Sequence, residues 1–135
     1  MLRLPDGLEV VGKGWFHNQS IQRLVVPSSV RELGEEAFGG CEGLREVVFE
    51  PGSRLERLGE SCFEECGLLE IVVPRSVRVV GAYAFLGCLE LSVLRFEAGS
   101  QARSLGHGAF FGTRLRRRGV RYPPALKTNG SEYKS

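Results

Sequence analysis

The sequence repeats itself loosely five times, and this repetition constrains the fold more than any other feature. A glycine that follows Leu or Val recurs at positions 12, 34, 59, 81 and 106, so the spacings are 22, 25, 22 and 25 residues. A phenylalanine four residues later keeps the same alternation, at positions 16, 38, 63, 85 and 110. Two markers with one period predict stacked structural units, each of which contacts only its neighbours.

Each unit contains two stretches that we expect to be strands, and one that we expect to be a short helix. The first stretch contains apolar residues such as Leu68, Ile71 and Val73. The last two of these are two positions apart, and this alternation is typical of a strand with one buried face. After a turn, a second inward pair follows, such as Val77 and Val80. The segment around the phenylalanine, GEEAFGG at 34–40, has room for barely two helical turns and would depend on burial of its Phe.

The full cadence stands as LLEIVVPRSVRVVGAYAFLGC at 68–88 and resembles the BspA-like class of leucine-rich repeats. This resemblance implies an α/β fold: a right-handed solenoid whose short parallel strands form one curved sheet, with a short helix in each coil. It also implies a role in binding, often on cell surfaces and often towards other proteins. The expected division is a solenoid at 1–121, with units near 4–25, 26–48, 49–72, 73–95 and 96–121, and then a loose polar tail at 122–135.

Composition excludes few functions. The formal net charge of +2 indicates no particular class of partner. No apolar run approaches the length of a membrane span, and MLRLPDGLEV at 1–10 lacks the apolar core of a signal peptide. We therefore expect either a cytoplasmic protein or a fragment of a longer surface or secreted protein.

The cysteines are expected to be structural. Cys41, Cys66 and Cys88 each follow the repeat phenylalanine by three residues, so they should stack inside as small buried reduced thiols. Cys62 replaces the alanine that precedes the phenylalanine in other units and should also point inwards. The chain has no C-x-x-C pair, and stacked parallel Cβ vectors suit a disulfide poorly. We expect no metal and no cofactor.

No group of residues predicts catalysis. His17 and His107 lie about four coils apart, and the repeat supplies neither a nucleophile nor a carboxylate beside them. We interpret both histidines as surface or cap residues. The sequence therefore predicts a binding module and no enzyme.

The outward positions of the first strand are the candidate site for a protein ligand. They combine a row of valines with charged neighbours, and a contiguous exposed apolar row can mark a binding site. An equally weighted alternative is that valine simply suits a strand. The candidate residues are Val25, Val48, Val72, Arg23, Glu46, Glu70 and Arg95. Outward residues of the second strand alternate in charge and are expected to be structural: Glu9, Arg31, Glu56, Arg78 and Arg103.

Two further interpretations remain open for the ends of the solenoid. The stretch TRLRRRGVR at 113–121 would suit an anionic partner, either nucleic acid or an acidic protein, although we favour a solvated end cap and do not favour nucleic acid. The arginines concerned are Arg114, Arg116, Arg117, Arg118 and Arg121. An open first coil would also permit end-to-end stacking into a homo-oligomer, because an edge strand leaves backbone groups unpaired.

Overall fold

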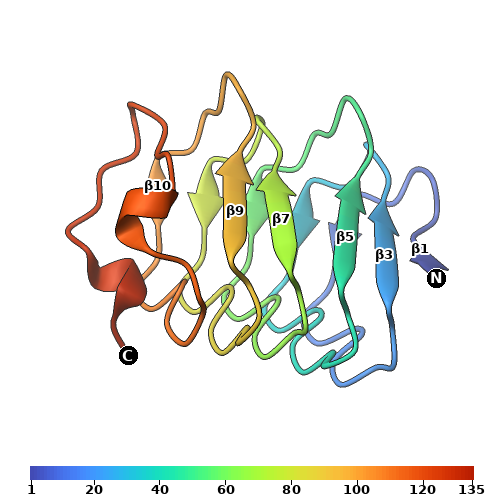
Figure 1. Cartoon of the computed structure of the whole chain (residues 1–135). Coiled ribbons are helices and arrows are strands. Elements are labelled where there is room, and N and C mark those ends of the chain that lie inside the picture. Colours follow the sequence, from blue (N-terminus) through green and yellow to red (C-terminus); the bar gives the residue numbers. More distant parts are fainter.

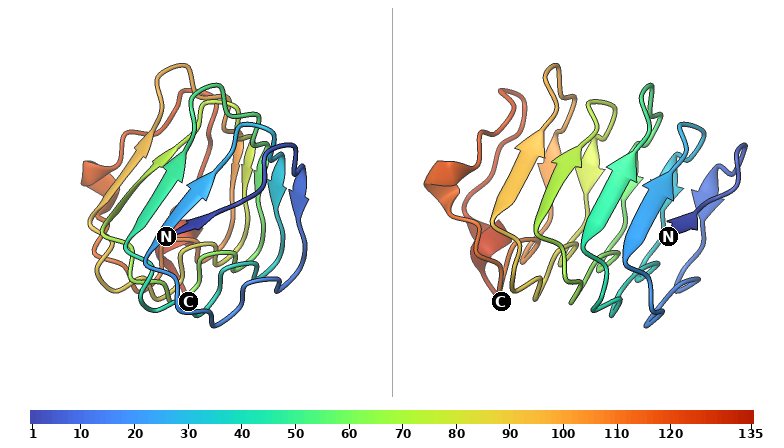
Figure 2. Two further views of the ribbon diagram at one scale, coloured as in Figure 1. Left: turned by 90° about the vertical axis from the view of Figure 1, so that its right-hand side faces the viewer. Right: turned by 45° about the vertical axis from the view of Figure 1, so that its right-hand side comes forward.

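The computed structural model describes residues 1–135 as a stack of coils, each with one strand on the front of the molecule and one on the back (Figures 1 and 2). The front strands are β1 (Leu2–Arg3), β3 (Arg23–Val26), β5 (Glu46–Phe49), β7 (Glu70–Val73) and β9 (Val93–Phe96). The back strands are β2 (Val10–Val11), β4 (Glu32–Leu33), β6 (Arg57–Leu58), β8 (Val79–Val80) and β10 (Ser104–Leu105). All paired strands are parallel, as the repeat predicts.

The expected helix in each coil is absent, and a run of turns takes its place. Around Phe38, the N–H of Ala37 donates to Gly34 within the turn at 3.1 Å, whereas the N–H of Phe38 donates to Cys62 of the next coil at 2.9 Å. The residues two places before and after each repeat phenylalanine have positive φ, as Glu36 does at 55°, and a right-handed helix requires negative φ. The prediction is wrong because a helix satisfies its own N–H groups, whereas these turns bond one coil to the next.

The interior is a set of continuous columns. The largest cluster of buried apolar residues has 31 members and runs through the whole stack. The rings of Phe38 and Phe63 lie 5.7 Å apart, and those of Phe63 and Phe85 lie 5.8 Å apart, in stacked orientation. The predicted alignment of equivalent side chains inside the molecule is confirmed.

The front strands do not form one curved sheet. The back strands form a single five-stranded sheet, but on the front β1, β3 and β5 form one sheet and β7 pairs only with β9. The backbone N–H of Glu50 donates to Val26 at 3.0 Å, and that of Glu97 donates to Val73 at 3.0 Å. Between β5 and β7 the equivalent position is Pro74, which has no N–H to donate.

The C-terminal segment 122–135 is not a loose tail. The N–H of Phe110 donates to the carbonyl of Glu132 at 2.7 Å, and the ring of Tyr133 meets that of Phe110 edge-on at 5.6 Å. The turns around each repeat phenylalanine form a series of hydrogen bonds between coils, which we call the turn ladder. Segment 122–135 extends this ladder by part of one more coil, even though its composition is polar. The segment contains a short 3-10 helix, Ser131–Tyr133, and another, Arg117–Gly119, lies just before it. Neither helix could span a membrane.

Candidate partner-binding surface

The predicted binding residues lie on the front strands, but they are not equally exposed. Val25 and Val48 are direct partners in the β3–β5 register, and Val72 is paired with Arg95 in the β7–β9 register. Val72 is 49% exposed and Val48 is partly buried, whereas Val25 is only 7% exposed. The expectation of three exposed valines is therefore wrong for Val25.

The side chain of Arg3 accounts for the burial of Val25. Arg3 lies opposite Val25 in the β1–β3 register. Its guanidinium reaches Glu50, which follows β5, with an Nη2–Oε1 distance of 2.9 Å. To join these two coils, the side chain of Arg3 crosses the outward side of β3 where Val25 lies. The repeat pattern could not predict this contact, because it links coils that are not sequence neighbours.

The charged candidates divide into paired and unpaired groups. Arg23 Nε lies 2.6 Å from Glu46 Oε1, and both side chains are about half exposed, so this pair contributes about 0.2–1 kcal/mol to stability. Neither Glu70 nor Arg95 forms an ion pair, and both are exposed. Glu70 and Arg95 are thus the charged groups on this surface that a partner can engage without displacing another side chain.

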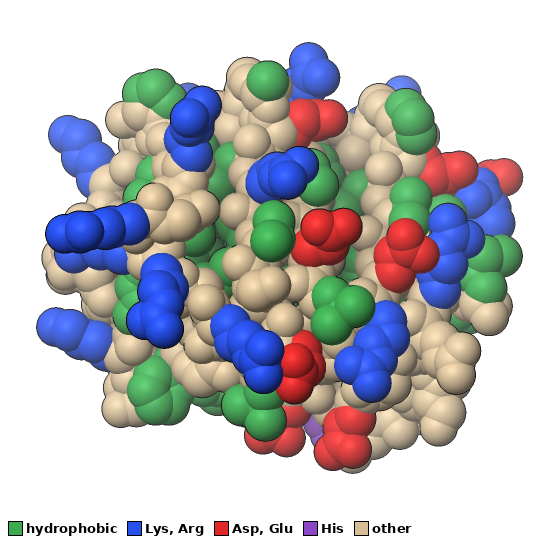
Figure 3. All heavy atoms as spheres, viewed as in Figure 1, with side chains coloured by type: hydrophobic (Ala, Val, Ile, Leu, Met, Phe, Trp, Pro, Cys, Tyr) green, Lys and Arg blue, Asp and Glu red, His purple; other side chains and the backbone are tan.

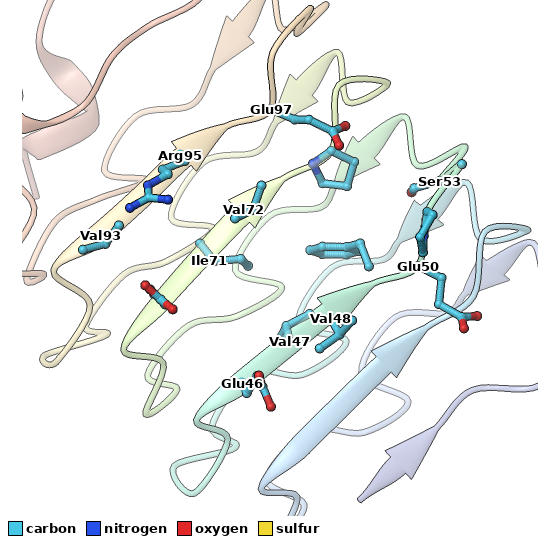
Figure 4. Close-up of a pocket in the computed structure, with 15 residues that line it drawn as sticks. Glu46, Val47, Val48, Glu50, Ser53, Ile71, Val72, Val93, Arg95 and Glu97 are labelled. Atoms are coloured by element: carbon cyan, nitrogen blue, oxygen red, sulfur yellow. The ribbon is translucent and has the colours of Figure 1, made fainter.

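A groove of 420 Å³ opens on this face where β5 and β7 are unpaired. Figure 4 shows Val47 and Val48 on β5, facing Ile71 and Val72 on β7 across the gap between the strands. Phe49 also lines the groove. Val72 is half exposed at this groove and Val48 and Phe49 are partly buried, whereas Val47 and Ile71 are buried beneath it.

Only a weak signal for this groove is present in the amino-acid sequence. Pro74 was visible as part of VPRSV at 73–77, and it removes one donor from the junction. However, Pro27 occupies the same place in VPSSV at 26–30, and β1 and β3 remain paired there. Proline at this position is thus insufficient to predict an open junction. Phe49, Ile71 and Pro74 were consequently missed as site residues.

The predicted Arg-rich coil lies at the C-terminal end and faces solvent. All five arginines are exposed, and of these only Arg114 forms an ion pair, with Glu90 at 3.4 Å. Residues 1–67 carry 7 basic and 12 acidic side chains, a net charge of −5, whereas 68–135 carry 11 basic and 4 acidic, a net charge of +7. Figure 3 shows basic side chains gathered at the left of the view, the end at which Figure 1 places the C-terminus.

The charge alternation on the back strands is realised only in part. Arg31 lies between Glu9, at 3.7 Å, and Glu56, at 3.1 Å, so the predicted pairing is confirmed for the first three coils. Arg78 and Arg103 form no ion pair. The alternation therefore sets contacts at one end of the back sheet and leaves the other end basic.

The cysteine column is buried, as predicted. The thiol of Cys66 donates to the carbonyl of Phe38 at 3.1 Å, and that of Cys88 donates to Phe63 at 3.0 Å. Burial raises the pKa of the Cys88 thiol to about 12, and burial also raises the pKa of Cys62 and of Cys66. These thiols stay protonated at neutral pH and are poor nucleophiles.

Neither histidine belongs to a cluster of chemical groups. His107 Nε2 lies 2.9 Å from the backbone oxygen of Ser135, and His17 is exposed. No three His, Cys, Asp or Glu side chains lie close enough together to hold a metal ion.

Comparison with known sequences identifies the repeat. The model of the BspA type leucine rich repeat region matches residues 4–131 in six copies, one more than the five units that the glycine and phenylalanine markers give. No curated protein matches the chain.

Comparison with solved structures supports the same fold. The pneumococcal vaccine antigen PcpA is similar over 95% of this chain and 42% of its own, with 20% identity and a TM-score of 0.75. A leucine-rich repeat protein from Bacteroides ovatus is similar over 98% of this chain and 39% of its own, with 24% identity and a TM-score of 0.73. A leucine rich cell surface protein from Faecalibacterium prausnitzii is similar over 98% of this chain and 48% of its own, with 16% identity and a TM-score of 0.53. The chain thus spans less than half the length of these three proteins.

Proposed function

Because the chain belongs to the BspA-type leucine-rich repeat family, we propose that it is a non-catalytic module that binds a protein on the outward side of its front strands. Leucine-rich repeat proteins generally act as protein-interaction modules. The observation that carries the proposal for this face is the half-exposed Val72 beside the unpaired Glu70, at the edge of an apolar groove. An apolar centre with a polar rim is the usual composition of a protein interface.

We propose that binding of the protein partner takes place at a cell surface. Among the similar structures, one is a vaccine antigen and another is a cell surface protein. By analogy, this chain would form part of a longer surface-exposed protein, with its front strands directed at a partner.

A matched pair of valine substitutions tests the binding face. Val72 on β7 is 49% exposed and Val10 on the back strand β2 is 48% exposed, so each can be changed to Lys without burying the new charge. Val72→Lys, alone or with Val48→Lys, should abolish capture of the partner in a pull-down from surface extracts. Val10→Lys should leave capture unchanged. Equal capture by both variants, with melting temperatures unchanged, would reject the front face as the binding surface.

The charge distribution favours a second candidate, the binding of an acidic protein at the C-terminal end. Four of the five arginines in the Arg-rich coil lack an ion-pair partner, and the surrounding half of the chain has a net charge of +7. Arginine in such a cluster can bind carboxylates bidentately. Changing residues 116–118 to alanine should weaken salt-sensitive binding of poly-glutamate. A shift of nucleic acid in a gel that is lost in the same variant would instead identify nucleic acid as the partner.

A further inference from the structure

The groove between β5 and β7 presents backbone as well as side chains. In the front sheets, β5 pairs with β3 on one side and β7 pairs with β9 on the other, so the edges of β5 and β7 that face each other have no strand partner. At the start of the junction, the N–H of Leu69 lies 3.5 Å from the carbonyl of Arg45, whereas the equivalent bonds in the neighbouring coils measure 2.9 Å and 3.1 Å. The junction is therefore looser than its neighbours, and backbone groups along it have no strand partner.

The rim of the groove is acidic. The lining includes four glutamates and one arginine, Arg95. Three of the glutamates are engaged from outside the groove by arginines of neighbouring segments: Glu46 by Arg23, Glu50 by Arg3 and Glu97 by Arg75. The fourth glutamate, Glu70, has no ion pair. A cationic side chain that enters the groove would therefore meet the free carboxylate of Glu70 at one end, and at the other end carboxylates that it shares with Arg3 and Arg75.

The carboxylates stand at a spacing that suits an extended chain. Glu46 begins β5 and Glu50 follows its last residue, four positions later, and Figure 4 shows them at opposite ends of the strand. Four residues of strand span about 13 Å at about 3.3 Å per residue. In an extended peptide, side chains at positions 1, 3 and 5 point the same way and cover the same length. The middle side chain of such a triplet would lie over the apolar floor between Val48 and Val72.

We propose that this groove binds an extended segment of the partner with the pattern basic-x-apolar-x-basic, aligned with β5 and β7. The inference rests on the proposed function of the front strands. The apolar side chain fills the space over Val48 and Val72, and the two basic side chains meet Glu46 and Glu70 at one end and Glu50 and Glu97 at the other. The segment lies over the junction, because β5 and β7 keep Cα atoms within 8 Å of each other, whereas a third strand between them would need about 9.6 Å. An anionic ligand would meet the same carboxylates with repulsion.

Titration of the full chain, labelled with ¹⁵N, against the acetylated peptide GSKTVTKSG tests the proposal. The amides of β5 and β7 should shift, with binding detectable at about 1 mM peptide. The charge-reversed peptide GSETVTESG and the peptide GSKTSTKSG, which lacks the apolar side chain, should each bind at least about tenfold more weakly. Shifts located elsewhere, shifts of equal size with GSETVTESG, or no shifts at about 1 mM would each overturn the proposal.

Two charge-matched variants locate the interaction. Glu70→Gln removes the unpaired carboxylate from the rim and should weaken binding of GSKTVTKSG about fivefold. Glu60→Gln removes an exposed carboxylate that does not line the groove and should leave binding unchanged. Equal weakening in both would show attraction by overall charge and would overturn the proposal.

The peptide titration tests the chemistry of the groove, and the pull-down with the valine variants tests the binding face, so either proposal can be rejected without the other. If capture of the partner depends on Val72 but the peptide does not shift β5 and β7, the groove chemistry is wrong and the binding face stands. If the peptide binds the groove but capture is indifferent to Val72→Lys, the groove chemistry stands and the proposed function fails.

Discussion

The back and the front of the solenoid are built from the same repeat but differ in continuity. On the back, a glycine follows every strand from β4 to β10, and each donates its N–H to the preceding coil at 2.8 Å: Gly34, Gly59, Gly81 and Gly106. On the front, the equivalent donor between β5 and β7 is missing, because Pro74 has no N–H. The comparison shows that one side of each coil is held in register at every junction. The other side can open locally to form a groove without breaking the stack.

The largest effect should follow from removal of a ring at the centre of the continuous side. Phe63 is fully buried and lies between the rings of Phe38 and Phe85. Phe63→Ala should lower the free energy of unfolding by about 3–5 kcal/mol, because the cavity is flanked by a coil on each side. Urea denaturation followed by circular dichroism measures the change. Phe111→Ala, at a 39% exposed position next to the repeat residue Phe110, is the control and should cost less than about 1 kcal/mol. Similar losses in both variants would refute the column as the source of stability.

The next largest loss of stability should follow from adding a methyl group at Gly59, where the backbones of two coils lie close together. A Cβ added to Gly59 would lie 2.6 Å from the carbonyl oxygen of Leu33, which is backbone and cannot move without parting the coils. Gly59→Ala should therefore cost about 1–3 kcal/mol. Gly52 has φ of +76° but open space around it, so Gly52→Ala reports backbone strain alone. A smaller loss for Gly59→Ala than for Gly52→Ala would show that close approach on the back does not hold the coils together.

The closure of the turn ladder at the C-terminal end depends on a buried carboxylate. Glu132 is fully buried and accepts hydrogen bonds from the hydroxyls of Tyr122, at 2.8 Å, and Thr128. Burial opposes its ionisation, but the hydrogen bonds from Thr128, its own backbone N–H and Tyr122, together with the charge of Arg117, prevail and lower its pKa.

The lowered pKa of Glu132 predicts the sign of a pH effect. A carboxyl group whose pKa is lower in the folded than in the unfolded state stabilises the fold fully above its unfolded value, about 4.3, and loses that contribution as pH falls through the folded value. The free energy of unfolding should therefore drop below about pH 4. Glu132→Gln should cost about 1–3 kcal/mol at pH 7 and reduce this acid sensitivity. An unchanged pH profile in Glu132→Gln would assign the effect to other carboxylates.

The sequence predicted the interior columns that every unit repeats, but it did not predict the repeated turns or the features that belong to one unit. The columns of Phe38, Phe63 and Phe85 followed from spacing alone, because equivalent positions in a stack must meet. The run of turns around each phenylalanine was mistaken for a helix, because residues such as Glu36 and Tyr83 adopt a left-handed backbone that their side chains do not favour. Here the bonds between coils override local propensity.

The candidate site was harder to predict than the interior columns, because it depends on residues that belong to a single unit. The exposure of Val72 followed from its place in the strand, but the burial of Val25 depends on Arg3, an individual residue two coils away from Glu50. The groove depends on an unpaired junction, and Pro27 and Pro74 look alike in the sequence although only the second lies at an open junction. A repeat pattern describes the average unit, whereas a binding site is formed by departures from that average.

The smallest effect on stability should come from restoring the missing donor on the front. Pro74→Ala supplies an N–H at the position where Glu50 and Glu97 donate to the preceding coil. If the absent donor keeps β5 and β7 apart, the new amide should bond to Phe49 and exchange slowly with solvent. The free energy of unfolding should change by less than about 1 kcal/mol, since one hydrogen bond is gained as proline rigidity is lost.

Hydrogen exchange measured by NMR compares position 74 with Glu50 and Glu97. Fast exchange at position 74 would show that side chains lining the groove, such as Phe49 and Ile71, hold the strands apart. Slow exchange together with weaker binding of GSKTVTKSG would show that one imino acid turns a continuous sheet into a binding groove.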